Sequence, residues 1–134
     1  MTANVSAPST VAEHMTTGPL TIGPREPLAT AHRLMRRHAI RHLPVMEAGR
    51  LVGVVSQRDL YLLETLPGVD PKVEPVEEAM TEQPFSVAPD APLADVVREM
   101  AALRYGCAVV MEEGALVGIF TTTDALEMLG EACL

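Results

Sequence analysis

Two short motifs place a hydroxyl residue three positions before an aspartate. They are Ser56-Gln57-Arg58-Asp59 and Thr121-Thr122-Thr123-Asp124, and each follows a run of apolar residues. Where a helix begins, this spacing forms a capping box, so helix capping alone accounts for both ends of each motif. A helix start also offers backbone amides and a positive dipole to an anion, and a carboxylate one turn later can accept ribose hydroxyls. Taken alone the motifs favour capping, and ligand binding stays open.

The two motifs are corresponding parts of a tandem repeat. Residues 49–60 return in similar form as residues 114–125, and the spacing is 65 positions throughout. Met15 and Met80 show the same spacing, as do Gly53 and Gly118. At 134 residues, the chain is long enough for one compact body and too short for two independent enzyme domains.

The elements that must position the motifs follow from the hydrophobic pattern. The first repeat predicts a helical turn at 11–15, an extended piece at 20–22, a helix with one buried stripe after Pro27, a hairpin and a helix from Ser56. The second repeat predicts the same series. We therefore expect a mixed α+β fold, with strand, helix, strand, strand and helix in each of two repeats packed with pseudo-twofold symmetry. Residues 1–10 are expected to be a flexible tail, 11–66 the first repeat, 67–75 a linker and 76–130 the second repeat.

Composition excludes several classes of function. The net charge of −8 argues against a nucleic-acid partner, and the scarcity of aromatic residues leaves few surfaces for base stacking. Two cysteines, Cys107 and Cys133, make no disulfide framework and fit a reducing compartment. Neither a signal sequence nor an apolar run long enough to span a bilayer is evident. These features predict a cytoplasmic protein without a membrane partner.

The ordered set of motifs closely resembles the CBS domain, the module named after cystathionine β-synthase. In the first repeat the resemblance rests on Met15-Thr16, on residues 40–45 and on residues 49–60; in the second it rests on Met80-Thr81, on residues 106–110 and on residues 118–124. It extends over residues 11–129. The resemblance implies a tandem pair, or Bateman module, that binds adenosine-containing ligands such as AMP, ADP, ATP or S-adenosylmethionine in the clefts between the repeats. It also implies a regulatory role, a homodimer and a regulated protein partner of unknown identity.

The resemblance assigns roles to the two motifs. Ser56 and Thr121 correspond to residues that contact phosphate, and Asp59 and Asp124 to residues that accept ribose hydroxyls. With the resemblance included, ligand binding becomes the favoured interpretation of both motifs.

The resemblance also assigns apolar walls to each pocket, contributed by the opposite repeat. It places Leu20 and Ile40 at the site of Asp124, and Phe85 and Tyr105 at the site of Asp59. Val54 and Ile119, two residues before each hydroxyl, are expected to line the same walls. The alternative is that all six side chains simply belong to the hydrophobic core. The six residues are Leu20, Ile40, Val54, Phe85, Tyr105 and Ile119.

Charge differs strongly between the repeats. Residues 11–60 contain seven arginines against four acids, a net charge of +3, whereas residues 76–125 contain two arginines against nine acids, a net charge of −7. Arg41 and His42 stand where relatives carry basic residues that reach the phosphates, but the second repeat has Gly106 and Cys107 there. We therefore expect the two sites to bind phosphate-bearing ligands unequally.

Catalytic chemistry finds little support in the sequence. His38 and His42 lack an evident third metal ligand, Cys107 has no evident histidine partner, and neither a Walker loop nor a dinucleotide glycine fingerprint is present. The favoured hypothesis is therefore a stand-alone, non-catalytic sensor of an adenosine-containing ligand, without a metal or a certain cofactor. A ligand-free scaffold is the second hypothesis, and an enzyme acting on a small metabolite is the third.

Overall fold

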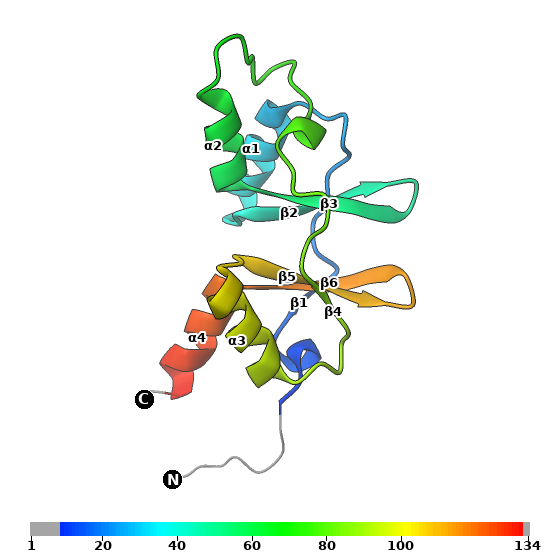
Figure 1. Ribbon diagram of the computed structural model, residues 1–134, viewed down its shortest axis with the longest axis vertical. Helices are drawn as coiled ribbons and strands as arrows, with labels where there is room; N and C mark the ends of the chain where they lie inside the picture. Colours follow the sequence, from blue (N-terminus) through cyan, green and yellow to red (C-terminus); the bar gives the residue numbers. More distant parts are fainter. Residues whose placement is uncertain (1–8, 133–134) are drawn as a thin grey trace. The chain divides into compact units, whose positions relative to one another are not determined.

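The computed structural model describes residues 9–132 and divides the chain into two units (Figure 1). Residues 1–8 of the predicted tail, and Cys133, lie outside the described residues. Unit 1 comprises Met1–Gly18 and Phe85–Leu134, and unit 2 comprises Pro19–Pro84.

Unit 2 is a two-stranded hairpin with two helices on one of its faces (Figure 1). Its elements are α1 (Leu28–His38), β2 (His42–Glu47), β3 (Arg50–Ser56), α2 (Gln57–Glu64) and the 3-10 turn η2 (Val76–Glu78). The predicted extended piece before α1 is reduced to a single parallel bridge between Ile22 and Val45.

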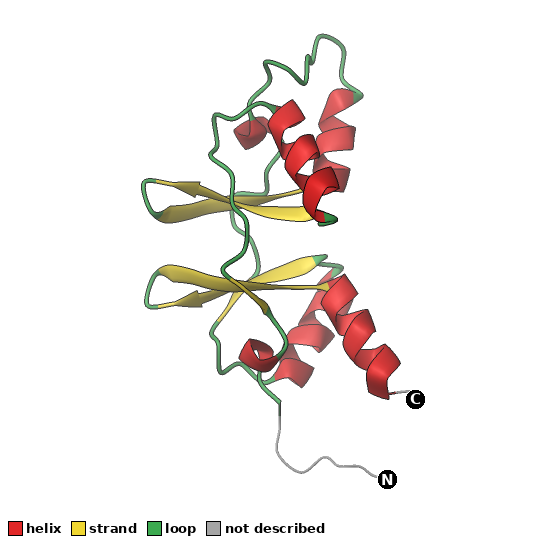
Figure 2. Cartoon of the chain, turned by 180° about the vertical axis from the view of Figure 1, so that it is seen from behind, coloured by secondary structure: helices red, strands yellow, loops and turns green. Residues whose placement is uncertain are grey.

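Unit 1 has a four-stranded sheet in the order β1-β6-β5-β4, again with both helices on one face (Figure 2). Its elements are the 3-10 turn η1 (Val11–Glu13), β1 (Thr16–Thr17), β4 (Ser86–Val87), α3 (Leu93–Leu103), β5 (Cys107–Glu112), β6 (Ala115–Thr121) and α4 (Thr122–Ala132). The short β4 lies parallel to β5, and the other strand pairs are antiparallel. The predicted mixed α+β fold is confirmed.

The hydrophobic pattern explains why these segments form helices that pack on their sheets. In α1 the buried residues Leu28, Ala31 and Met35 recur at three- and four-residue spacing, and α3 repeats this pattern. Each hairpin turns through two residues with positive φ, Ala48-Gly49 in unit 2 and Glu113-Gly114 in unit 1, as the tightest antiparallel connections require.

Each unit contains the helical turn of the other repeat. Val11 of η1 is fully buried in the apolar cluster beneath α3, and Val76 of η2 is fully buried in the cluster beneath α1. Backbone hydrogen bonds hold both turns in place, because Val11 N donates to Ala91 O and Val76 N donates to Glu26 O. The units in space therefore differ from the repeats in sequence by an exchange of their first segments.

The segments just before the two turns are also held by backbone hydrogen bonds. In the predicted linker, Glu74 O accepts a hydrogen bond from Leu28 N, at the start of α1. In the described part of the predicted tail, Ser9 O accepts from Leu93 N, at the equivalent place on α3. Both segments therefore brace the start of a helix in their own unit.

Candidate functional site

In unit 2, Ser56 and Asp59 form a complete capping box at the start of α2. Ser56 Oγ accepts a hydrogen bond from Asp59 N at 3.0 Å, and Asp59 Oδ2 accepts one from Ser56 N at 2.9 Å. Ser56 has extended backbone dihedrals, so it ends β3 and starts the helix at the same point. The capping interpretation is therefore correct for this motif, and both side chains are held in one orientation.

Thr121 and Asp124 form the equivalent pair in unit 1, at the start of α4. Thr121 Oγ1 accepts a hydrogen bond from Asp124 N at 3.2 Å, and Asp124 Oδ2 accepts one from Thr121 N at 2.9 Å. Capping is confirmed here too. The two units thus present the same constellation, 65 residues apart.

Each capping box leaves hydrogen-bonding capacity at the helix start. Gln57 N donates to Arg41 O at 2.9 Å and Asp59 N donates within the box, but Arg58 N has no partner among residues 9–132. The same range offers no partner to Asp59 Oδ1, and Asp59 is half-exposed. One amide donor and one carboxylate oxygen therefore remain for a ligand with both an anionic group and a hydroxyl.

His42 adds a second titratable group beside this helix start. In the β2–β3 ladder it pairs directly with Ser56, so the two side chains lie on the same face of the hairpin. Burial lowers the pKa of His42 below its ordinary value; the Asp59 carboxylate opposes this shift, and Arg41 adds to it. Burial therefore disfavours the protonated form of the His42 imidazole.

Unit 1 lacks both basic groups at the corresponding place. Gly106 occupies the position equivalent to Arg41. Its carbonyl oxygen accepts a hydrogen bond from Thr122 N at 3.0 Å, as Arg41 O accepts one from Gln57 N, but it has no basic side chain. Cys107 pairs with Thr121 in the β5–β6 ladder, as His42 pairs with Ser56. The two helix starts are alike in hydrogen bonding and different in charge.

Val54 and Ile119 lie on the strands that lead to the two boxes. Their relative exposures are 5% and 6%, yet neither belongs to the apolar cluster of its own unit. Val55 and Phe120, the next residues along each strand, do belong to those clusters, so alternation points Val54 and Ile119 to the face away from the helices. They share that face with Ser56 and Thr121.

The other four predicted wall residues differ in burial. Leu20 and Tyr105 are exposed at 37% and 40%, so the core alternative does not describe these two. Ile40 is half-buried against the cluster of unit 2. Phe85 is half-buried against the cluster of unit 1 and stacks on Tyr105, with 5.2 Å between the ring centroids. The assignment of each pair to the site of the opposite repeat stays a prediction.

The two Met-Thr pairs brace the strands before the boxes, a role that the residue pattern did not predict. Thr81 and Val54 exchange two backbone hydrogen bonds, at 2.8 and 3.0 Å. An added Cβ on Gly53 would meet Thr81 O at 2.6 Å and Met80 Sδ at 2.8 Å, so this close approach requires glycine. In unit 1, Thr16 pairs with Ile119 in the same way. The repeat could have indicated this role. The two Met-Thr pairs lie 65 residues apart, and so do Gly53 and Gly118, the glycines that they approach.

Within residues 9–132 no group of three or more His, Cys, Asp or Glu side chains is arranged to hold a metal ion. None of the helices in that range has the length and apolar character needed to cross a membrane.

Comparison with known proteins gives sequence relatives of two kinds. Inosine-5'-monophosphate dehydrogenase of Korarchaeum cryptofilum is 34% identical over 106 residues, but the match spans 78% of this chain and only 21% of the enzyme. The CBS domain-containing protein YhcV of Bacillus subtilis is 33% identical over 116 residues, which are 87% of this chain and 82% of YhcV.

Structure and family comparisons agree with these relatives. The crystal structure of CBSX2 in complex with AMP matches with a TM-score of 0.76 and 26% identity, over 93% of this chain and 98% of that one. The family model of the CBS domain matches twice, at residues 11–63 and 76–131. Each match starts at a helical turn and includes one hydroxyl–aspartate box. The chain therefore belongs to the CBS domain family and carries two CBS domains.

Proposed function

We propose that this chain is a regulatory, non-catalytic module that binds an adenosine-containing ligand of the AMP, ADP, ATP or S-adenosylmethionine class. One observation carries the proposal: each capping box orients an aspartate and leaves one carboxylate oxygen and one helix amide without a partner among residues 9–132. A nucleotide offers a hydroxyl for the first and an anionic group for the second. The AMP complex of a protein 26% identical to this chain supports this ligand class.

Capping and binding are compatible roles for the same side chains. In the box, one oxygen of Asp59 is committed to Ser56 N, which leaves Oδ1 for a ribose hydroxyl. Because the box holds the carboxylate in place, little side-chain entropy remains to be lost on binding. The capping geometry thus preorganises the group that the ligand would use.

The two helix starts are proposed to bind phosphate unequally. Arg41 and His42 flank the box of unit 2, and Gly106 and Cys107 stand at the equivalent places of unit 1. A phosphate near His42 would favour the protonated imidazole, which burial disfavours in the unliganded protein. AMP binding at that site should therefore take up protons and become tighter as the pH falls, whereas adenosine binding should not.

A regulatory module must transmit a ligand-dependent conformational change to a surface that a partner contacts. We propose that the protein acts as a homodimer and passes the ligand-dependent change to a separate protein partner. The relatives bear only on whether the partner is separate. The match spans 82% of YhcV, which resembles this chain in extent, whereas it spans 21% of the dehydrogenase, where the matched segment is part of a larger enzyme.

Calorimetric titration of the purified chain tests the proposal. Adenosine, AMP, ADP, ATP, S-adenosylmethionine and NAD form the ligand set, with GMP as a base-specificity control. We expect saturable binding of at least one adenosine compound and a rise in melting temperature with it. Absence of both effects for every adenosine compound would refute the sensor function and favour a ligand-free scaffold. Turnover of a ligand by the isolated chain would instead favour an enzyme.

The unequal use of phosphate has its own test. His42→Ala should weaken AMP binding more than adenosine binding, and Cys107→Ala, at the equivalent position of unit 1, is the matched control. Two equal AMP sites, together with an equal effect of His42→Ala on AMP and adenosine, would show that the asymmetry is absent.

A further inference from the structure

An apolar groove lies beside the start of α3 in unit 1. Its volume is about 300 Å³, and it is lined by Ser9, Pro92, Leu93, Ala94, Val97 and Met128. None of these lining residues carries a charge. Because the lining includes residues of both α3 and α4, an apolar side chain placed in the groove would contact both helices and be removed from water.

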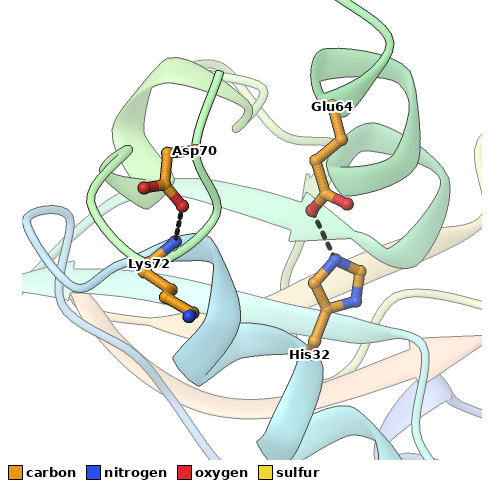
Figure 3. Close-up of polar contacts among 4 residues, drawn as sticks. All are labelled: His32, Glu64, Asp70 and Lys72. Atoms are coloured by element: carbon orange, nitrogen blue, oxygen red, sulfur yellow. Dashed lines mark hydrogen bonds and ion pairs between the residues drawn. The ribbon is translucent and has the colours of Figure 1, made fainter. Parts of the chain in front are cut away.

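The equivalent place in unit 2 is covered by the segment that precedes η2. There Ala29 N donates a hydrogen bond to Pro71 O at 2.9 Å, and Val69 packs against the apolar cluster of the unit. A local turn, in which Asp70 Oδ1 accepts from Lys72 N at 3.0 Å, shapes this segment beside α1 (Figure 3). The start of α1 is therefore covered by a part of its own unit.

The two units match as far as Ser9 and differ before it. Leu93 N donates to Ser9 O at 2.9 Å, as the equivalent residues of unit 2 do. Ala94 is equivalent to Ala29, but Ala94 N has no hydrogen-bond partner among residues 9–132. The start of α3 therefore keeps a backbone donor that its counterpart in unit 2 uses.

Exposure of the two helix starts differs in the same way. Pro27 and Ala29 of unit 2 are half-buried, whereas their equivalents Pro92 and Ala94 are exposed. A segment that supplied a backbone oxygen and an apolar side chain would give the start of α3 the cover that α1 has.

The helices of unit 1 also lack a polar link that unit 2 has. His32 Nε2 on α1 and Glu64 Oε2 on α2 lie 2.5 Å apart (Figure 3). Their equivalents are Val97 and Leu129, whose side chains cannot form such a bond. A side chain that contacts both Val97 and Met128 would link α3 to α4 through apolar contacts instead.

Residues 1–8 have the position and the composition to fill the groove. They directly precede Ser9, which lines it, and none of their side chains is charged. From Val5 to Ser9 an extended chain spans up to about 13 Å. Val97 lies four residues after Leu93, the residue bonded to Ser9, which is about 6 Å along the helix axis. Val5 is therefore within reach of the groove.

We propose that residues 1–8 fold back over the start of α3 and fill this groove, with Val5 between α3 and α4 and a backbone oxygen of the segment bonded to Ala94 N. The segment then covers unit 1 as residues 69–73 cover unit 2. The match is one of role and not of exact register, because the residue 65 positions before Val69 is Asn4. This contact lies within unit 1, replaces the flexible tail expected from composition, and does not depend on the adenosine ligand.

Amide hydrogen exchange measured by NMR on the full chain tests this contact. Val5→Asp places a charge in an apolar groove and should release the segment, so the Ala94 amide should exchange roughly three- to tenfold faster than in the native chain. Thr2→Asp adds the same charge to the same segment but outside the groove, and it should leave the rate unchanged. The Ala29 amide is the internal standard, because its bond to Pro71 O is present in every variant.

A substitution in the groove itself gives a second measurement. Ala94→Arg fills the groove from an exposed position and should displace the segment without disturbing the core. The methyl NMR signals of Val5 should then move from shifts typical of a packed valine to those of an unstructured chain. Ala101→Arg, at an exposed position of α3 that does not line the groove, is the matched control and should leave these signals in place.

Three outcomes would overturn the proposal. The Ala94 amide could exchange at the same rate in the native chain and in Val5→Asp, or Val5 could show the signals of an unstructured chain in the native protein. Protection of Ala94 that grows with protein concentration and survives Val5→Asp would assign the groove to a second copy of the chain instead.

Discussion

Asparagine substitution at Asp59 separates ligand binding from helix capping. In the structure Asp59 Oδ2 accepts the hydrogen bond from Ser56 N, and an asparagine side-chain oxygen can accept the same bond. Asp59→Asn therefore keeps the box but puts an amide NH2 group where Oδ1 stood, so the charge is lost and a ribose hydroxyl can only accept a neutral hydrogen bond there. Asp59→Ala removes both. Comparison of the two variants assigns each loss to its cause.

The expected magnitudes follow from the bonds that each variant removes. A hydrogen bond to a charged group is worth about 1.5–3 kcal/mol and a neutral one about 1 kcal/mol, so Asp59→Asn should weaken adenosine-compound binding at its site about tenfold. Asp59→Ala should weaken it by about ten- to a hundredfold. Loss of the box should also cost about 1 kcal/mol of unfolding free energy in the alanine variant only.

Two assays and two controls complete the experiment. Isothermal titration calorimetry measures affinity, and urea unfolding measures stability. Asp124→Asn tests the box of unit 1 and should affect a different class of site. Asp70→Asn is the matched control, because Asp70 Oδ1 accepts from Lys72 N at 3.0 Å in a local turn that has no proposed ligand (Figure 3). If Asp59→Asn and Asp124→Asn bind every adenosine compound with native affinity while the alanine variants lose stability, the aspartates are caps only.

Three further predictions concern stability, each measured by urea unfolding of the variant beside the native chain. Gly53→Ala should cost roughly 1–3 kcal/mol, because its Cβ would lie 2.6 Å from Thr81 O, whereas Gly130→Ala on α4, with open space around it, should cost nothing; equal effects would contradict the close approach. Ala39→Gly should stabilise the chain by about 1 kcal/mol, because Ala39 ends α1 with φ 54°, where a Cβ is strained; a loss of stability would show that this strain is absent. The native pKa of His42 lies below its unfolded value, so the native state binds fewer protons and the unfolding free energy should fall as pH drops below about 6.5. His42→Gln should make that fall shallower, and an unchanged pH profile would contradict the effect of burial on this residue.

Local structure could be predicted from the sequence where neighbouring residues alone decide it. The Ala48-Gly49 turn forms because two apolar runs flank residues that tolerate positive φ. The box at Ser56 forms because its hydroxyl and the Asp59 carboxylate lie three residues apart at a helix start. Such features involve contacts within a few residues, so the spacing of residue types is sufficient to predict them.

Side-chain environments were harder to predict when they depend on distant segments. Leu20 and Tyr105 have apolar or aromatic side chains and could have been core residues by type, but both are exposed. The pKa of His42 also depends on burial, which lowers it, and on Asp59, which lies 17 positions later and opposes the shift. Nothing in the neighbouring sequence of these residues reports their exposure.

The sequence by itself determined the repeat, the order of its elements and the two hydroxyl–aspartate boxes. Only the tertiary structure decided which helical turn belongs to which unit. Val11 and Val76 occupy equivalent positions in the repeat, so the hydrophobic pattern fits burial of either valine beneath either helix. The fold buries Val11 beneath α3 and Val76 beneath α1, because the strands and backbone hydrogen bonds that receive each turn come from a part of the chain far from it in sequence. A periodic sequence specifies what each segment can bury, and long-range packing decides against which partner.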